Sequence, residues 1–396
     1  MIHLDEIKKH KFIVLCYEHY TPLGVIRSLG EVGIRPIVII LNNKWSKVAS
    51  ASKYISRIHY VKDVQEGFNL LISQYGGGRH LPFVIPCDDK FALICDENYN
   101  KLKGRFYVQN AAEEQGRISF FQNKNNINEI AKRHGFNVAK TYVVKKGEIP
   151  QDIEYPVITK TISSYEGNWK SDYHICNSEA ELQEAYKAIK AENLLLQKFI
   201  VKKTELCLDG VIVNHGKQWL CIASRYPFAI PEGYSAEMII TNLNNEKHYA
   251  EIKNSLDSMF VDIGYEGIFS LEFMVDHEEN LWFLEENFRS STWTYAGTAL
   301  KMNFVILWAE ACLYGSFPHD AEVKVPKGYK AMAEFPDFKQ RVLKHRITLN
   351  EWIKEVRSCD CLFFYNKLDK KPFWTSLLYK GMNAIRTKFI RKPGGI

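Results

Sequence analysis

The chain lacks the long apolar segment of a membrane-spanning helix, since no run approaches the roughly 20 residues required. Its N-terminal residues show no signal-peptide pattern. It contains neither a G-x-G-x-x-G fingerprint for dinucleotides nor an evident D-x-D metal motif of the kind found in sugar-nucleotide transferases. These absences argue against a membrane protein and a dinucleotide enzyme, and they weaken the case for a glycosyltransferase.

Paired cysteines and a strong charge bias are also missing. The nine cysteines are scattered, and Cys359 and Cys361 form the only close pair, with no second pair to complete a zinc site. We therefore expect reduced thiols in a cytoplasmic protein. The net charge of +6 is too weak to indicate nucleic acid but suits anionic ligands such as nucleotides. A chain of 396 residues that is 46% hydrophobic predicts a soluble protein of two or three domains.

The N-terminal region predicts a parallel sheet. Residues 11–17 and 35–41 are continuous apolar segments typical of buried strands. Between them, a helix is expected to begin near Thr21 and to end at Gly33, because glycine favours the residue after a helix. A strand–helix–strand unit of this kind implies parallel strands joined by a right-handed crossover.

Two aspartates follow another predicted strand of this sheet. Residues 82–86 are apolar, and Asp88 and Asp89 come directly after them. Polar residues after a parallel strand lie at the carboxyl edge, where open α/β sheets bind ligands. We expect Asp88 and Asp89 to contact substrate.

A hairpin in the second half of the chain contains the strongest chemical signal. Residues 268–276 and 281–289 predict two strands joined by a polar turn. If Asp276 pairs with Leu281, the register places Glu272 opposite Glu285. Like charges at that position are destabilising unless a cation lies between them.

The same hairpin offers further polar groups. Alternation places Leu281, Phe283, Glu285, Asn287 and Arg289 on one face. Two carboxylates and the Asn287 carbonyl are hard oxygen ligands that suit Mg²⁺, and Arg289 can hold a phosphate or carboxylate. The alternative is a surface hairpin whose charges are solvated.

Several features lie between these two regions. They are a polar helix with Lys124, a strand at 155–161 with Lys160, the loop 163–170, a strand at 194–200, and a strand beginning at Glu205. After residue 326 the pattern is weaker, and the chain ends in a basic, partly amphipathic helix. That helix is either a surface helix packed on the core or a weak contact with anionic lipid.

These features occur in the order seen in ATP-grasp ligases, which the chain resembles from about residue 10 to 315. The N-terminal region is similar to the pre-ATP-grasp domain. The segments Thr21-Pro-Leu-Gly and Pro86-Cys-Asp-Asp are most similar to carboxylate–amine ligases of the D-aspartate-ligase and carbamoyl-phosphate-synthase-like group.

The resemblance implies an α/β and α+β architecture in three parts. A parallel-sheet pre-ATP-grasp domain (1–115) precedes an ATP-grasp domain (116–315), whose two α+β subdomains clamp ATP and whose lid spans about 140–200. A small C-terminal extension (316–396) follows. One departure is the loop 163–170, which has a single glycine where the family often has more.

The resemblance also implies roles for individual residues. ATP phosphates and the covering loop would involve Lys124, Lys160, Ser163, Ser164, Gly167 and Lys170. The adenine and ribose would be held by Gln197, Lys198, Phe199, Ile200 and Glu205. Mg²⁺ (or Mn²⁺) would be bound by Glu272, Glu285 and Asn287. Arg289 and Arg225 would act in catalysis, and Ser290 and Ser291 would bind substrate with Asp88 and Asp89.

The implied function is ATP-dependent formation of an amide from a carboxylate and an amine through an acyl phosphate. Cell-wall or surface-polysaccharide biosynthesis is the expected setting, and a homodimer is expected. The alternative is a catalytically silent ATP-binding module that acts as a sensor or partner. A sugar-nucleotide glycosyltransferase is a third hypothesis, although the missing D-x-D motif counts against it.

Overall fold

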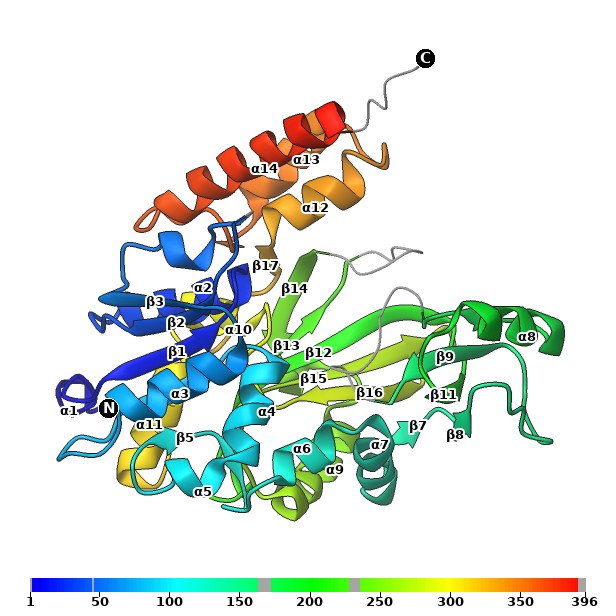
Figure 1. The fold of residues 1–396 in the computed structure, drawn as a ribbon, viewed down its shortest axis with the longest axis horizontal. Helices are drawn as coiled ribbons and strands as arrows, with labels where there is room; N and C mark the ends of the chain where they lie inside the picture. The colour runs from blue at the N-terminus through cyan, green and yellow to red at the C-terminus, as the bar shows by residue number, and fades with distance from the viewer. Residues whose placement is uncertain (1, 45, 163–171, 228–235, 391–396) are drawn as a thin grey trace.

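The computed structural model describes residues 2–44, 46–162, 172–227 and 236–390. Its N-terminal part is a five-stranded parallel sheet in the order β3-β2-β1-β4-β5 (Figure 1). The strands are β1 (Phe12–Cys16), β2 (Ile37–Leu41), β3 (Arg57–Val61), β4 (Phe83–Pro86) and β5 (Tyr107–Val108). The predicted parallel sheet is confirmed.

Local capping explains where two helices of this part begin. At α2 (Tyr20–Gly30), the His19 ring accepts a hydrogen bond from the Thr21 amide at 3.2 Å. At α4 (Asp89–Glu97), Asp88 accepts one from the Phe91 amide at 3.0 Å. Both caps satisfy amides that the first helical turn leaves without partners. The remaining helices here are α1 (Leu4–Ile7), η1 (Ala49–Ala51), α3 (Val64–Gln74) and α5 (Tyr99–Leu102).

A nine-stranded sheet forms the centre of the molecule. Its main order is β18-β17-β14-β13-β12-β15-β16-β7, and β6 pairs with β15 at one end. The strands are β6 (Asn110–Ala111), β7 (Asn137–Val138), β12 (Lys202–Val213), β13 (Gln218–Arg225), β14 (Glu237–Asn242), β15 (Tyr265–Asp276), β16 (Leu281–Asn287), β17 (Tyr329–Met332) and β18 (Cys361–Leu362).

Helices pack on both faces of this sheet. Side chains of α6 (Arg117–Gln122), α7 (Lys124–Arg133) and α9 (Tyr249–Ile263) share one buried cluster with β12, β15 and β16. The short η2 (Leu243–Asn245) adds to that cluster. The opposite face packs on α10 (Thr294–Ala299) and α11 (Phe304–Tyr314). The two helices are separate because Lys301, between them, adopts a positive φ of 69°.

A separate four-stranded antiparallel sheet follows the order β10-β9-β11-β8. Its elements are β8 (Thr141–Lys145), β9 (Val157–Thr161), β10 (Ile175–Cys176), α8 (Glu179–Ala188) and β11 (Asn193–Lys198). The α8 side chains bury one face of the sheet in a core of its own. In Figure 1 this sheet lies beside the ends of β12 and β15.

The C-terminal part contains α12 (Glu334–Arg341), α13 (Leu349–Ser358) and α14 (Lys371–Ile390). It is fixed to the N-terminal part by Arg27 of α2, which is fully buried. The Arg27 guanidinium donates to Asp369 and to the carbonyls of Phe363 and Phe364 at 2.7 to 3.2 Å. No helix in the described ranges is long and apolar enough to cross a membrane.

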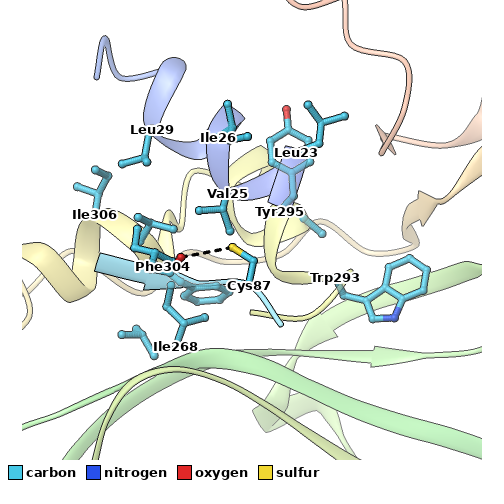
Figure 2. Close-up of a cluster of buried hydrophobic side chains, with 14 of the residues drawn as sticks. Leu23, Val25, Ile26, Leu29, Cys87, Ile268, Trp293, Tyr295, Phe304 and Ile306 are labelled. Atoms are coloured by element: carbon cyan, nitrogen blue, oxygen red, sulfur yellow. Dashed lines mark hydrogen bonds between the residues drawn. The ribbon is translucent and has the colours of Figure 1, made fainter. Parts of the chain in front are cut away.

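One hydrophobic cluster runs through the interior that these parts share. Figure 2 shows side chains of α2 packed against the region of α10 and α11, with Cys87 among them and Ile268 on the side away from α2, beside the strands drawn in green. The cluster also contains Ile40, Val211, Tyr329 and Phe363, so it connects all three predicted domains. The domain boundaries at 115/116 and 315/316 stay predictions.

Candidate active site

A cavity of about 720 Å³ opens where the three regions meet. The carboxyl ends of the parallel strands, the inner face of β15 and β16, and the edge of the four-stranded sheet all contribute to its lining. A smaller cavity of about 170 Å³ adjoins it, since Lys160, Glu272 and Glu285 line both. The predicted site residues that line one or both cavities are Lys124, Lys160, Gln197, Lys198, Phe199, Ile200, Glu205, Glu272, Glu285, Asn287, Arg289 and Ser291.

The two glutamates face each other as predicted. Glu272 of β15 pairs directly with Glu285 of β16. The register shifts by one residue beyond this pair, so that Val275, not Asp276, pairs with Leu281. The extra residue is Leu284, which forms a β-bulge.

Because of the bulge, part of the second strand faces the opposite side of the sheet from the one predicted. Leu281 and Phe283 do not share a face with Glu285 but lie in the buried cluster on the other side of the sheet. Leu284 and Glu285 instead both line the cavities, because a bulge opposes two residues to one. Asn287 stays on the cavity face, as predicted.

Burial makes it unfavourable for both carboxylates of the pair to be ionised at once. Burial, followed by the charges of Glu285 and Glu205, raises the pKa of Glu272 well above its usual value. Two desolvated carboxylates at one position favour protonation of one of them unless a cation is present. The two glutamates and the Asn287 carbonyl provide hard oxygen donors, which is the donor set that suits Mg²⁺.

Two lysines approach this pair from different elements. Lys124 begins α7 and Lys160 lies on β9, and both line the smaller cavity with the glutamates. Burial, together with the Lys124 charge, lowers the pKa of Lys160 to about 8. Its ammonium donates to the Gln197 side chain at 2.7 Å. The arrangement places two cations where an anion of high charge would be neutralised.

The segment after β11 borders the cavity with polar backbone and apolar side chains. The amides of Lys198 and Phe199 already donate to carbonyls of Lys140 and Pro156, at 2.8 and 2.9 Å. They are therefore occupied in this conformation. Carbonyl groups and the Ile200 amide are the backbone groups that this segment would offer to the base of a nucleotide.

Glu205 lies at the start of β12 beside Lys202, whose ammonium donates to its carboxylate. Both side chains line the larger cavity. The carboxylate of Glu205 remains an acceptor suited to hydroxyl groups.

Arg289 is held at the other end of the hairpin. Its guanidinium forms a bidentate pair with Asp89, at 2.5 and 3.2 Å, and donates to the Asn287 carbonyl at 3.1 Å. Burial alone would lower the pKa of Arg289, but Asp89 outweighs it and keeps the pKa above its usual value. Arg289 is thus charged and fixed in orientation, and Asp89 is its partner.

Four of the predicted residues that the structure describes lie outside the cavity lining, and one of them is Asp89, the partner of Arg289. Arg225 was expected to face the site, but it pairs with Leu206 of β12 and shares the opposite face of the sheet, where it contacts Glu246 at 2.6 Å. Asp88 caps α4. Ser290 is fully buried, whereas Ser291 reaches the cavity. Consecutive side chains of a strand point to opposite faces, so the position of Arg225 opposite Leu206 directs its side chain away from the cavity.

Four predicted residues, Ser163, Ser164, Gly167 and Lys170, lie outside the described ranges. The structure therefore places none of the loop that was expected to cover the phosphates.

Aromatic residues that no sequence motif indicated line the end of the cavity beyond Arg289. They are Tyr17, His19, Tyr20, Tyr226 and Trp293. Burial, followed by the charges of Arg289 and Lys380, lowers the pKa of His19 to about 4, so the ring is neutral at pH 7. Tyr17, His19 and Tyr20 come directly after β1, and the reasoning applied to Asp88 and Asp89 would have found them.

Asp209 is a further missed residue. It is fully buried on β12 and accepts a hydrogen bond from the Ser291 hydroxyl. Burial raises the pKa of Asp209 to about 7. Asp209 therefore positions Ser291 at the cavity without lining it.

Comparison with known proteins gives a result for structure only. No known family matches the sequence, and no curated protein matches it. Among solved structures, N5-carboxyaminoimidazole synthetase from Staphylococcus aureus, complexed with ADP, is 16% identical, with 86% of each chain covered and a TM-score of 0.62.

Two other solved structures are similar over most of the chain. L-amino acid ligase from Bacillus licheniformis is 13% identical, with 79% of this chain and 78% of that chain covered and a TM-score of 0.57. The biotin carboxylase domain of 2-oxoglutarate carboxylase from Hydrogenobacter thermophilus, in complex with MgADP, is 19% identical, with 79% and 72% covered and a TM-score of 0.59. Together with the arrangement of the sheets, these similarities show that the chain has the ATP-grasp fold, as the resemblance of its sequence implied.

Proposed function

We propose that this protein is an ATP-dependent carboxylate–amine ligase. A substrate carboxylate oxygen forms a bond to the γ-phosphorus of ATP, and the bond to the bridging oxygen breaks, which releases ADP and leaves an acyl phosphate. An amine nitrogen then attacks the acyl carbon. The carbon–oxygen bond to phosphate breaks, the nitrogen loses a proton, and an amide and phosphate are the products.

The observation that carries this proposal is the convergence of two facing glutamates with two lysines in one cleft. Glu272 and Glu285 would hold Mg²⁺ (or Mn²⁺) with Asn287, while Lys124 and Lys160 would hold ATP phosphates. When bound, the metal would neutralise charge on the transferred phosphoryl group. The protein itself would supply position and fixed charge.

The remaining residues divide the cleft into two ends. Gln197, Lys198, Phe199, Ile200 and Glu205 would surround the adenosine, and the loop residues Ser163, Ser164, Gly167 and Lys170 would cover the phosphates. Arg289, fixed by Asp89, would stabilise the acyl phosphate. Ser291 and the aromatic residues beyond it would contact the carboxylate and amine substrates.

The solved neighbours support small-molecule substrates, since one is named as an L-amino acid ligase and another is complexed with ADP. We place the reaction in cell-wall or surface-polysaccharide biosynthesis in the cytoplasm. A homodimer is part of the proposal, and the biotin carboxylase domain is described as a dimer. Light scattering of the purified protein tests the proposed homodimer, and a monomer at micromolar concentration would contradict it.

Weak contact with a membrane surface is a further part of this proposal. Trp374 and Leu378 of α14 are 55% and 66% exposed, and Leu377 and Met382 beside them are exposed too. The sequence around them is basic, and exposed apolar groups among basic residues suit an anionic lipid surface. Sedimentation with phosphatidylserine vesicles should recover the protein. Equal recovery of the Trp374→Ser/Leu378→Ser variant would contradict the proposal.

The proposed activity is tested by measuring ADP release with panels of carboxylates and amines. ADP release that needs both substrates, together with a new amide detected by mass spectrometry, is expected. The Glu285→Gln variant should bind ATP in the absence of metal but turn over far more slowly. If wild-type protein binds Mg-ATP and no pair of substrates is ever joined, the protein is an ATP-binding sensor or partner instead.

A further inference from the structure

A second group of potential metal ligands lies at the opposite edge of the parallel sheet from the cleft. Strands β1 and β4 are parallel neighbours, with Phe12 opposite Phe83. The segments that lead into the two strands are therefore side by side, and the Phe83 amide donates to the Lys11 carbonyl at 2.8 Å. This places His10, just before β1, next to His80, just before β4.

Glu6 completes the group from α1, four residues before His10. One oxygen of Glu6 and one ring nitrogen from each histidine all lie within 4.8 Å of one another. Two ligands on one Zn²⁺ lie about 3.4 Å apart, because each bond is about 2.1 Å. Side-chain rotation of roughly 1.4 Å would close the group around an ion.

A hydrogen bond already fixes the ring of the buried His10. His10 is only 8% exposed, and its Nδ1 lies 2.8 Å from the Leu81 carbonyl. A carbonyl can only accept, so Nδ1 carries the proton and the Nε2 lone pair is available. Metal-bound histidines are commonly fixed by this kind of second hydrogen bond. The His80 ring lies edge-on to His10 at 5.1 Å between centroids.

Glu6 is anionic and has one competitor. The Lys9 ammonium donates to its carboxylate at 2.6 Å, and this hydrogen bond lowers the pKa of Glu6. Both side chains are substantially exposed, so the Lys9 contact is weak and can give way to a metal ion.

We propose that Glu6, His10 and His80 form a binding site for Zn²⁺ or a similar transition-metal ion. Two imidazole nitrogens and one carboxylate are a donor set that suits zinc, with water in the fourth position. The oxygen-only set of the cleft suits Mg²⁺ instead. The second site joins the N-terminal helix to the loop before β4, so the bound ion stabilises the parallel sheet and takes no part in the ligase chemistry.

The test uses untagged, full-length protein freed of metal with a chelator. Titration with Zn²⁺ in the presence of excess Mg²⁺ should show one equivalent bound with a Kd of about 10 µM or tighter, and Tm should rise by a few degrees. Co²⁺ should give the visible absorption of a nitrogen-ligated ion. Binding should weaken as the pH is lowered, since protonated histidine cannot ligate.

Variants separate this site from other histidines. His80→Ala should lower the Zn²⁺ affinity at least tenfold, and Lys9→Gln should raise it a few-fold by removing the competing cation. His277→Ala, a change in the exposed turn of the hairpin, is the matched control and should have no effect. Because His10 is buried, His10→Ala is interpreted only if its circular dichroism without zinc matches that of the wild type.

Two results would overturn the proposal. One is the absence of a one-equivalent binding event with a Kd of about 10 µM or tighter. The other is a His80→Ala variant that binds Zn²⁺ as tightly as the wild type. ADP release in Mg²⁺ should be the same for His80→Ala and wild type, so that failure of this site is distinguished from failure of the proposed ligase.

Discussion

The carboxylate pair of the cleft and the Arg27 centre beneath the C-terminal part are both buried and charged, yet their surroundings differ. Arg27 donates to Asp369 and to three carbonyls, and Asp369 also accepts from Ser52 and the Lys53 amide. Glu272 instead faces Glu285, a group of the same charge.

This difference indicates what each cluster does. A buried charge whose partners are all protein groups holds a fold together, because its hydrogen bonds are complete without any ligand. Buried like charges that converge on a cavity are characteristic of functional sites. The comparison predicts that damage to the first cluster changes stability, whereas damage to the second changes activity.

The largest expected effect is on the stabilising cluster. Arg27→Met should lower the free energy of unfolding by about 3–5 kcal/mol, because it leaves Asp369 and several carbonyls buried without their donor. Denaturant unfolding measures this. The double variant Arg27→Met/Asp369→Leu should recover part of the loss. A loss under about 1 kcal/mol for the single variant would remove the distinction between the two clusters.

The next effect concerns the cleft. Glu285→Gln should lower kcat about 10²–10³-fold, which is typical for loss of one charge-stabilising group. Without metal, its free energy of unfolding should equal or exceed that of the wild type, because one of two repelling carboxylates is gone. Glu286→Gln is the matched control one residue away on the opposite face, and its kcat should stay within about threefold. Equal losses of activity in both variants would contradict the proposed role of Glu285.

A third prediction uses Glu286 itself. Among the described residues its carboxylate has no hydrogen-bond partner, and burial raises its pKa from 4.5 to about 8. Between these values the folded chain binds a proton that the unfolded chain has released. Glu286 therefore makes stability fall by about 1.4 kcal/mol per pH unit as pH rises from 4.5 to 8.

The measurement is unfolding of wild type and Glu286→Gln at pH 5, 6, 7 and 8. The variant should gain stability relative to wild type at each step, by about 2 kcal/mol or more in total. A difference that stays constant from pH 5 to pH 8 would show that Glu286 is ionised in the folded protein.

The smallest effect is expected at Arg225. Its ion pair with Glu246 lies on the far side of the sheet from the cleft. Arg225→Gln should lower stability by about 1 kcal/mol or less and should leave kcat/KM within about twofold. A tenfold loss in kcat/KM with unchanged stability would show that Arg225 contributes to catalysis.

Much of the site could be predicted from short-range patterns. The Glu272–Glu285 pairing follows from two strands and a turn, since alternation fixes which side chains face each other. The parallel sheet follows from apolar strands separated by a capped helix. Both inferences need only neighbouring residues, and both are confirmed by the structure.

The features that the sequence did not reveal depend on contacts between distant segments. The position of Arg225 is set by β13 pairing with β12, which is invisible in the local pattern. The pair between Arg289 and Asp89 joins residues 200 positions apart. The clustering of Tyr17 with Trp293 likewise requires the N-terminal sheet to meet the end of the hairpin. Long-range packing decides such positions, and local periodicity carries no information about it.

The bulge at Leu284 makes the hairpin change parity along its length. From the turn, odd-numbered Leu281 and Phe283 enter the core, and after the bulge odd-numbered Glu285 and Asn287 enter the cleft. If Leu284 paired with Glu272 as an ordinary strand residue and the turn end kept its register, Glu285 and Glu286 would exchange faces. The arrangement of the cleft therefore depends on one extra apolar residue, and an alignment that matched Leu284 to a regular strand position would assign the proposed metal ligand to the wrong glutamate.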